Sequence, residues 1–255
     1  MSLKVQVLSS GSSGNAALYS AGSCHVLIDC GLTARTLTAL LRHAGVEPRA
    51  LSAIFVTHEH TDHIQGLPVF LRQTRVPLFV APESFETEAF RDVKAHVEPI
   101  RPNVPVTLGP LTVTPFPLPH DAACCFGYVL QADGVRAVQA TDLGSPTSLV
   151  RESLRGAHCM LVEFNHDVDR LMAGSYPIHV KLRVRGELGH LSNEQGAQLV
   201  RECAGAETQS LYLMHLSQQN NVPALASLAA REALEGKPVK VVVSEHLAPA
   251  PPWEG

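Results

Sequence analysis

Short apolar runs follow one another closely at the start of this chain, whereas later runs alternate with stretches of helical spacing. Residues 5–8, 17–19 and 25–29 are mostly apolar and are separated by segments rich in small polar residues and glycine, which predicts strands joined by turns. Further strands are predicted at 53–56, 76–80, 111–116, 126–131, 135–140, 158–163, 211–214 and 239–243. Helices are predicted at 36–43, 67–75, 83–92, 148–154, from a capping box at 192 to about 203, and 223–234.

This order of elements predicts an α/β fold. Strands that come together first and then alternate with helices suit two mixed sheets packed face to face, with helices on the outer faces. No repeat, low-complexity tract or charged linker divides the chain, so we expect one domain over residues 1–247. The proline-rich residues 248–255 are expected to form a flexible tail.

Composition narrows the class of protein. A hydrophobic content of 45% with only 17% charged residues supplies a core and excludes a disordered chain. Six cysteines without a Cys-x-x-Cys pair are expected to be buried free thiols in a reducing compartment, rather than disulfides or thiolate ligands. The first residues lack the apolar stretch of a signal peptide, and no apolar run has spanning length, so we expect a soluble, cytoplasmic protein without a membrane partner.

The net charge of −4 does not by itself indicate a nucleic-acid binder. Locally, however, Lys181, Arg183 and Arg185 occupy alternate positions, which in a strand would share one face. Two interpretations of this predicted basic strand stay open. It is either a solvated edge protected by cations or a surface that contacts phosphates.

The richest chemistry lies directly after the apolar run 53–56. The pattern His-x-His-x-Asp-His at positions 58–63 places His58, His60, Asp62 and His63 in one short loop. Imidazole suits zinc, iron and manganese, and carboxylate suits the harder ions of that set. Because the loop offers more donors than one ion takes from neighbouring residues, it indicates a pair of divalent ions, zinc or manganese.

Three further donors fall where predicted strands end, namely His120, Asp142 and His215. Strand ends that converge on one edge of a sheet direct side chains into a common cleft. Any one of these residues alone is more often structural than a ligand. Their joint occurrence after strands, together with the histidine loop, favours a shared site.

On these residues the chain resembles the metallo-β-lactamase superfamily, over essentially its whole length. The resemblance implies an αββα sandwich with a dinuclear centre. One ion would be held by His58, His60 and His120, and the second by Asp62, His63 and His215, with Asp142 bridging. Asp29 would brace the ligand loop through hydrogen bonds. His246 is a rival to His215, which we favour because the Leu-Ser context after it matches the nuclease branch of the superfamily.

Further segments are similar to the WalJ (YycJ) subfamily, whose members are viewed as 5′-3′ DNA exonucleases. These segments are residues 11–16, 163–167, 189–193 and 215–221, together with 176–178 followed by Lys181 and Arg183. The segments around His190 and His215 are also similar to ribonuclease Z, in which corresponding histidines serve catalysis and metal binding. Local variation at Cys124 and Cys125 and the presence of His246 are departures from the pattern.

This resemblance implies a dinuclear phosphodiesterase acting on nucleic acid, most readily DNA, with a metal-bridging hydroxide as the nucleophile. Asp62 would orient the nucleophile, and His190, held by Glu163, would stabilise the phosphate or protonate the leaving oxygen. His190 is alternatively only a helix-entry residue beside the capping box. Substrate phosphates would be gripped by Lys181, Arg183, Arg185 and the turn containing Ser13 and Asn15, although a tight hairpin explains that turn equally well.

Two rival functions remain at this point. A thioesterase, lactonase or small cyclic phosphodiesterase would use the same metal clamp, and the negative net charge slightly favours it. A binding protein that keeps the fold without turnover is the other alternative, but such relatives usually lose ligands. The residues do not fix the native metal, the choice between DNA and RNA, the polarity of digestion or the oligomeric state.

Overall fold

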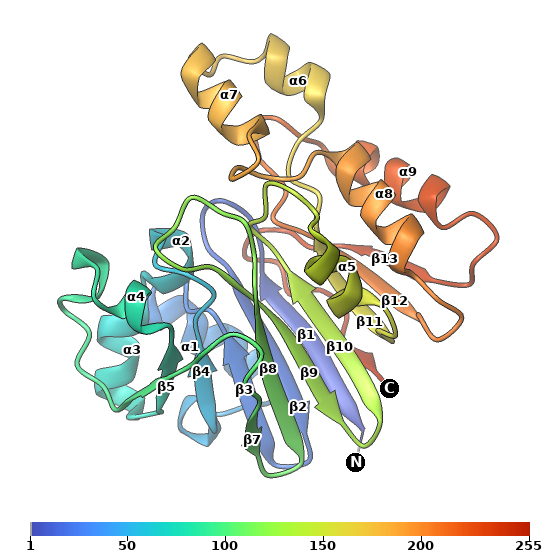
Figure 1. The fold of residues 1–255 in the computed structure, drawn as a ribbon. Coiled ribbons are helices and arrows are strands. Elements are labelled where there is room, and N and C mark those ends of the chain that lie inside the picture. The colour runs from blue at the N-terminus through green and yellow to red at the C-terminus, as the bar shows by residue number, and fades with distance from the viewer. Residues whose placement is uncertain (1) are drawn as a thin grey trace.

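The computed structural model describes residues 2–255 and contains two seven-stranded sheets (Figure 1). The first sheet has the order β14 (Trp253–Glu254), β1 (Leu3–Ser9), β2 (Ala16–Ala21), β3 (Cys24–Ile28), β4 (Ala53–Phe55), β5 (Leu78–Val80) and β6 (Val97–Pro99). Pairing is antiparallel from β14 to β3 and parallel from β3 to β6. The predicted mixed sheet is therefore observed.

The second sheet has the order β13 (Lys240–Val243), β12 (Ser210–Met214), β11 (Cys159–Glu163), β10 (Val135–Ala140), β9 (Phe126–Ala132), β8 (Leu111–Pro117) and β7 (Val106–Leu108). Strands β10 to β13 are parallel, and β7 to β10 are antiparallel. Because β10, β11 and β12 are adjacent and parallel, their carboxyl ends meet at one edge.

Helices cover the outer face of each sheet (Figure 1). In the first half these are α1 (Ala34–His43), α2 (Thr61–Ile64), α3 (Leu67–Thr74) and α4 (Pro82–Phe85), with 3-10 turns at Pro48–Ala50 and Glu88–Phe90. In the second half they are α5 (Ser148–Leu154), α8 (Asn193–Cys203) and α9 (Pro223–Ala233). Helices α6 (Val168–Ala173) and α7 (Ile178–Arg185) lie apart from the sheet faces, beyond the ends of the strands (Figure 1). The predicted capping box opens α8, with Ser192 and Gln195 as its two partners.

Three apolar clusters hold these layers together. In β4, Phe55 packs in the core between the sheets, while Ile54 packs under the helices of the first half, as expected when successive strand residues face opposite sides. A third cluster joins the second sheet to α5, α8 and α9, with Val162 and Leu199 among its members. Helix, sheet, sheet and helix thus form the expected αββα sandwich.

The prediction of one helix over 83–92 is wrong. The structure has α4 followed by a separate 3-10 turn, and Thr87 between them has extended backbone angles. Phe85 and Phe90 pack together with ring centroids 5.5 Å apart. A spacing of five residues places them on different faces of a continuous helix, so the chain breaks to bring both towards the core.

The predicted basic strand is a helix, α7. Pro177 precedes its first residue and Gly186 follows its last, and both residue types favour helix boundaries. At 100° per residue, Lys181 and Arg185 lie about 40° apart on one face of the helix, whereas Arg183 lies on the opposite face. The one-sided basic strand expected from alternate spacing is therefore absent.

The expectation of a flexible tail is also wrong, because the tail forms the edge strand β14. Val5 is paired with Trp253 and Lys4 with Glu254. Trp253 is buried against the core between the sheets, and its Nε1–H donates to Oε1 of Gln209 at 3.2 Å. Burial of this large side chain offsets the entropy of ordering the proline-rich segment.

All six cysteines are free, and all but the half-buried Cys124 are buried. Over residues 2–255, no helix combines the length and the apolar character needed to cross a bilayer.

Candidate metal centre

The histidine loop leaves the carboxyl end of β4 and runs into the short helix α2. His60 is the residue before the first turn of α2, and Asp62 and His63 lie within that helix. The backbone N–H of His63 donates to the carbonyl of His60 at 2.9 Å, which folds the loop back on itself. One tight turn thereby directs four donor side chains to the same side.

The other candidate ligands follow strands of the second sheet at the same end of the sandwich. His120 follows β8, Asp142 follows β10, and His215 directly follows β12. Asp142 and His215 have φ values of 63° and 56°, and Asp29 after β3 has 65°. Such left-handed backbone is uncommon for residues other than glycine, and here it turns the chain sharply where each strand ends.

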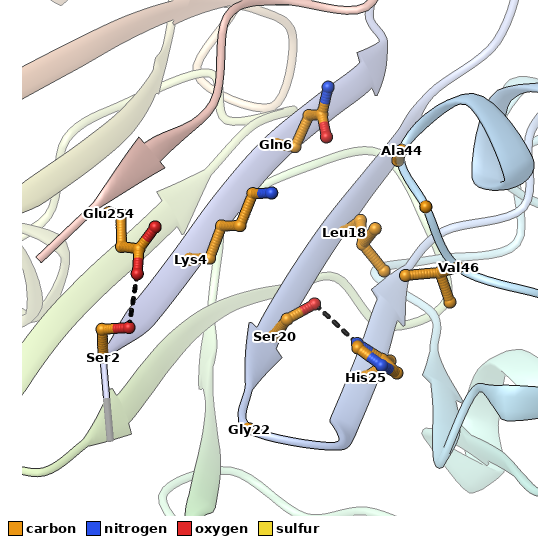
Figure 2. A pocket seen from close by; sticks show the side chains of 11 residues that line it. Ser2, Lys4, Gln6, Leu18, Ser20, Gly22, His25, Ala44, Val46 and Glu254 are labelled. Atoms are coloured by element: carbon orange, nitrogen blue, oxygen red, sulfur yellow. Dashed lines mark hydrogen bonds between the residues drawn. The ribbon is translucent and has the colours of Figure 1, made fainter.

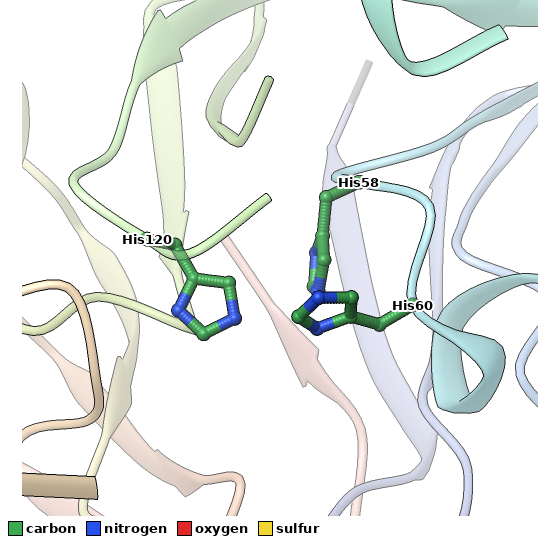
Figure 3. A group of neighbouring side chains, drawn as sticks. All are labelled: His58, His60 and His120. Atoms are coloured by element: carbon green, nitrogen blue, oxygen red, sulfur yellow. The ribbon is translucent and has the colours of Figure 1, made fainter. Parts of the chain in front are cut away.

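These side chains converge in four overlapping groups whose donor atoms lie within 4.8 Å of one another. The first group is His58, His60 and His120, shown in Figure 3. The second is Asp62, His63 and His215, and a third joins Asp142 to His58 and His63. The fourth is Asp142, Glu163, His190 and His215. Asp142 therefore lies between the two histidine groups.

In each buried histidine of the proposed ligand set, an oxygen lies within hydrogen-bond distance of Nδ1, which leaves Nε2 available. His63 Nδ1 lies 2.8 Å from Oδ2 of Asp29, and His58 Nδ1 lies 3.0 Å from Oγ1 of Thr57. His120 Nδ1–H donates to the carbonyl of Gly189 at 3.1 Å. Partners of this kind fix the ring orientation of metal-binding histidines.

Glu163 plays the same part for two more rings. Its Oε1 lies 2.8 Å from His190 Nδ1 and 3.1 Å from His215 Nδ1. Its Oε2 accepts the backbone N–H groups of Leu143 and Leu191 at 3.0 and 3.2 Å. One fully buried carboxylate thus ties together the loops that carry Asp142, His190 and His215.

Several inward-facing atoms of this cluster have no hydrogen-bond partner among the described residues. They are Nε2 of His58, Nε2 of His120 and Oδ2 of Asp142, all buried. Each such group left unpaired costs about 1–3 kcal/mol. Two lone-pair nitrogens beside an unpaired carboxylate oxygen form the donor set that a divalent cation satisfies. The residues present therefore fit a divalent metal.

The charges of the cluster support the same conclusion. Burial lowers the pKa of His58, and the neighbouring imidazoles lower it further, so this ring is neutral and able to ligate. Burial opposes ionisation of Asp62, but His63 and His215 hold its pKa well below the usual range. Burial alone would lower the pKa of His215, whereas Asp142, Asp62 and Glu163 raise it to about 10. Buried carboxylates thus demand positive charge, which either protons or metal ions supply.

A family model described as the beta-lactamase superfamily domain matches residues 25–216. The chain belongs to the beta-lactamase superfamily. Exodeoxyribonuclease WalJ of Streptococcus pneumoniae serotype 2 is 33% identical over 230 residues, which cover 88% of this chain and 86% of that protein. Exodeoxyribonuclease YycJ of Bacillus anthracis is 31% identical over 249 residues, covering 93% and 91% respectively.

Among solved structures, the metallo-beta-lactamase fold protein YhfI from Bacillus subtilis superposes with a TM-score of 0.77 at 20% identity, over 100% of this chain and 99% of that one. This match confirms the predicted fold. This beta-lactamase superfamily member is, like its named relatives, a metal-dependent hydrolase.

Of the two substrate-contacting residues predicted in the turn after β1, Asn15 lies at the metal centre, with Nδ2 3.1 Å from His63 Nε2 and 3.3 Å from Asp62 Oδ2. Ser13, two residues earlier, is exposed. The rival His246 belongs to none of the four ligand groups found in residues 2–255, and its Nδ1 lies 3.4 Å from Oγ of Ser9.

The three cations of α7 have three different environments. Lys181 is buried, and its Nζ donates to the carbonyl of Met172 at 2.7 Å. Arg183 donates through Nε to Oδ2 of Asp121 at 2.5 Å, next to His120. Arg185 is exposed and forms no ion pair within the described part of the chain. Only Arg185 is thus both charged and unpaired.

The structure also reveals supporting residues that sequence reasoning did not identify. Thr57 donates its backbone N–H to Oδ1 of Asp29 at 2.8 Å and contacts two ligand rings through its hydroxyl. Glu59 accepts the backbone N–H of Ala123 at 2.6 Å and the hydroxyl of Ser84 at 2.8 Å. Both residues adjoin His58, and that adjacency is the only signal the sequence carries for them.

Proposed function

We propose that this chain is an exonuclease that removes nucleotides from the 5′ end of DNA and that works with two divalent ions, zinc or manganese. The observation that carries the proposal is the Asp62, His63 and His215 group, which offers a second ligand set beside His58, His60 and His120. Similarity to WalJ and YycJ over most of the chain supports a nucleic-acid substrate.

The ligand roles follow from which atoms are free. His58, His60 and His120 would hold one ion, and Asp62, His63 and His215 the other. Asp142 would bridge them, because its Oδ2 lies 3.3 Å from His63 Nε2 and its Oδ1 lies 4.0 Å from His120 Nε2. Asp29 supports the loop and does not ligate, since Thr57 and His63 already engage both of its oxygens.

When bound, such a pair of ions lowers the pKa of a water towards about 7 and neutralises charge on a phosphodiester. The residues of the chain position the attacking water and transfer a proton to the leaving oxygen. Asp62 is the least buried of the carboxylate ligands, and it orients the attacking water for in-line displacement at phosphorus.

His190 is placed to act on the leaving oxygen. Its ring is partly exposed, while Glu163 holds Nδ1, so that Nε2 is left for substrate. Burial works to lower the pKa of His190, but Glu163 and Asp142 outweigh it and raise that pKa. The imidazolium therefore persists near neutral pH and donates a proton to the departing 3′ oxygen.

Digestion of labelled strands tests this proposal. Stripped protein is reloaded with zinc or manganese and given single-stranded DNA, double-stranded DNA and RNA, labelled at either end. We expect mononucleotides to appear from the 5′ end of DNA in at least one metal. A lactone, thioester and cyclic-nucleotide panel runs in parallel, and turnover there without any DNA cleavage would replace the nuclease proposal by a small-molecule hydrolase.

A further inference from the structure

The helices that cover the first sheet carry cations without carboxylates. Residues 30–46 and 63–82, which include α1 and α3, contain four arginines and no aspartate or glutamate. The helices over the second sheet differ, because residues 193–207 and 223–235, which include α8 and α9, contain five glutamates and two arginines. The chain as a whole has a net charge of −4. The outer face of the first sheet is therefore a positive region on a negative protein.

Two hollows of the surface meet where α1, α3 and the 3-10 turn Pro48–Ala50 come together. They have volumes of about 490 and 530 Å³ and share part of their lining. Four exposed arginines line the two hollows, namely Arg42, Arg49, Arg72 and Arg75. We call the two hollows together the arginine groove.

Three of these guanidinium groups are available to an anion. Arg49 donates through Nε to a backbone carbonyl in the last turn of α3 at 3.2 Å, which holds its side chain across the groove. Arg72 and Arg75 form no ion pair within residues 2–255. Glu47 is the one carboxylate among the described residues that line the groove, and both of its oxygens accept Nε of Arg42 at 3.2 Å. The groove thus keeps an excess of positive charge.

Helix stability alone does not explain this excess. Cations in the last turn interact favourably with the carbonyl end of a helix, and Arg42 and Arg72 occupy such positions. Arg201 and Arg231 occupy the same positions in α8 and α9, yet glutamates accompany them there. The other two arginines of the groove lie outside both of its helices. The exclusion of carboxylates therefore indicates an anionic partner.

A hollow that also borders the end of α1 lacks this asymmetry (Figure 2). It measures about 360 Å³, and its lining includes the cation Lys4 together with the carboxylate of Glu254. Glu254 accepts the hydroxyl of Ser2 at 2.6 Å, and Oγ of Ser20 lies 2.8 Å from Nδ1 of His25. Balanced charge and polar groups that pair with one another give this hollow no preference for an anion. The uncompensated arginines, rather than the presence of a hollow, distinguish the arginine groove.

One helix connects the metal centre to the arginine groove. Helix α3 begins three residues after the end of α2, which carries Asp62 and His63. It has eight residues and therefore spans about 12 Å before it reaches the groove. Each DNA strand carries a phosphate about every 3.4 Å, so a strand whose end lies at the metal centre reaches the groove within roughly four to eight nucleotides.

We propose that the arginine groove binds the phosphate backbone of the part of the DNA strand that is not yet digested, an inference that rests on the proposed exonuclease function. Guanidinium groups pair with phosphate oxygens through two parallel N–H bonds, so exposed arginines suit backbone phosphates. Contacts of this kind carry no sequence information, so the groove holds DNA of any sequence. It anchors long strands while their ends are cleaved, and it lowers KM for long DNA but not for short DNA.

The test compares the groove variant Arg72→Glu/Arg75→Glu with the control variant Arg201→Glu/Arg231→Glu, both loaded with metal. All four positions are exposed at the ends of outer helices, so both variants change the net charge equally and disturb helix ends alike. The first readout is equilibrium binding of circular single-stranded DNA, which has no end to digest. We expect the dissociation constant to rise about tenfold in the groove variant alone, and the slope of log affinity against log salt to fall by about two.

The second readout is KM for DNA of two lengths. For a strand of about 30 nucleotides, KM should rise about tenfold in the groove variant and stay at the wild-type value in the control variant. For a trinucleotide, which is too short to span α3, KM should be the same in all three proteins. An equal rise for both lengths would mean that the arginines act at the metal centre and not as a distant anchor, and it would overturn the groove.

The two proposals fail separately. Equal binding of circular DNA by the wild type and the groove variant overturns the groove, whether or not the protein digests DNA. Equal weakening in the groove and control variants also overturns it, because general charge then explains the effect. Weak binding by the groove variant alone, without digestion by any of the proteins, keeps the groove as a nucleic-acid surface and removes the exonuclease.

Two further measurements complete the test. Polyglutamate with as many charges as the DNA should bind the wild type more weakly than the DNA does, and equal binding would assign the groove to an acidic protein instead. The neutral variant Arg72→Gln/Arg75→Gln should weaken DNA binding in the same direction by a smaller factor, and it preserves the comparison if charge reversal impairs folding.

Discussion

The two sides of the metal centre are built in different ways. On the first sheet, one loop of consecutive residues supplies His58, His60, Asp62 and His63, and the buried carboxylate of Asp29 holds it. On the second sheet, three separate loops supply His120, Asp142 and His215. There, the buried carboxylate of Glu163 connects the loops of Asp142 and His215 with that of His190.

The donors of the first side are brought together because they are neighbours in the chain. The donors of the second side are brought together by tertiary structure. The first side is pre-assembled by a helical turn, so its donors stay close even when one of them is lost. The second side is assembled by strand pairing between β10, β11 and β12 and by one carboxylate that uses both oxygens. Damage to a brace should therefore cost more on the second side.

The largest effect is expected from removing two ligands of the first side. Asp62→Ala together with His63→Ala deletes two of the three donors of the second ion, so hydrolysis should fall below about 1% of wild type, beyond the 10–100-fold typical of outer-shell changes. Metal analysis should show one equivalent lost per chain. The protein should stay folded by circular dichroism. Retention of full activity in this variant contradicts the dinuclear proposal.

The two braces allow a direct comparison. An amide has one acceptor oxygen, so Glu163→Gln and Asp29→Asn each break one side of a carboxylate that engages partners through both of its oxygens. For Glu163→Gln we expect metal affinity to fall about 10–100-fold and the urea midpoint of unfolding to decrease. For Asp29→Asn we expect a smaller decrease of that midpoint, because the helical turn still holds its loop. Chelator titration and urea unfolding measure both quantities, with exposed Glu187→Gln as the control. Equal losses in the two brace variants would remove the distinction between the sides.

The same contrast explains what the sequence could reveal. The first side is visible as a motif because its donors are covalent neighbours, and β4 before it is an apolar run. His120, Asp142 and His215 could be proposed because each follows a predicted strand, but their convergence depends on strand pairing that no local pattern encodes. Gly189, whose carbonyl orients His120, carries no side-chain signal at all.

The wrong predictions have physical causes of the same kind. Alternating cations predict one face of a strand, but Pro177 and Gly186 set the ends of the helix α7. The proline-rich tail lacks a strand pattern, yet Trp253 finds a place against the core between the sheets and orders it. In both cases tertiary packing or boundary residues outweigh the local pattern.

A smaller effect is expected at the contact between the two sides. Glu59, in the loop of the first side, accepts a hydrogen bond from Ala123 in the segment after His120. Glu59→Ala removes this link and the contact with Ser84, which loosens the segment after His120, so activity should fall about tenfold while both ions remain bound. The measurements are the hydrolysis rate and the metal content of Glu59→Ala, with Ser84→Ala as the milder variant. Loss of metal without loss of rate would mean that Glu59 does not align the two sides.

The smallest effect concerns the surface beside the second side. Arg185 is exposed and unpaired among residues 2–255, whereas Lys181 is buried against the carbonyl of Met172. Arg185→Glu should weaken DNA binding severalfold and reduce the slope of log affinity against log salt by about one. Lys181→Met should leave that slope unchanged, because a buried, bonded ammonium does not release a counterion on binding. If Lys181→Met alters the slope and Arg185→Glu does not, the exposed Arg185 is not a phosphate contact, and the proposed role of this surface in DNA binding is wrong.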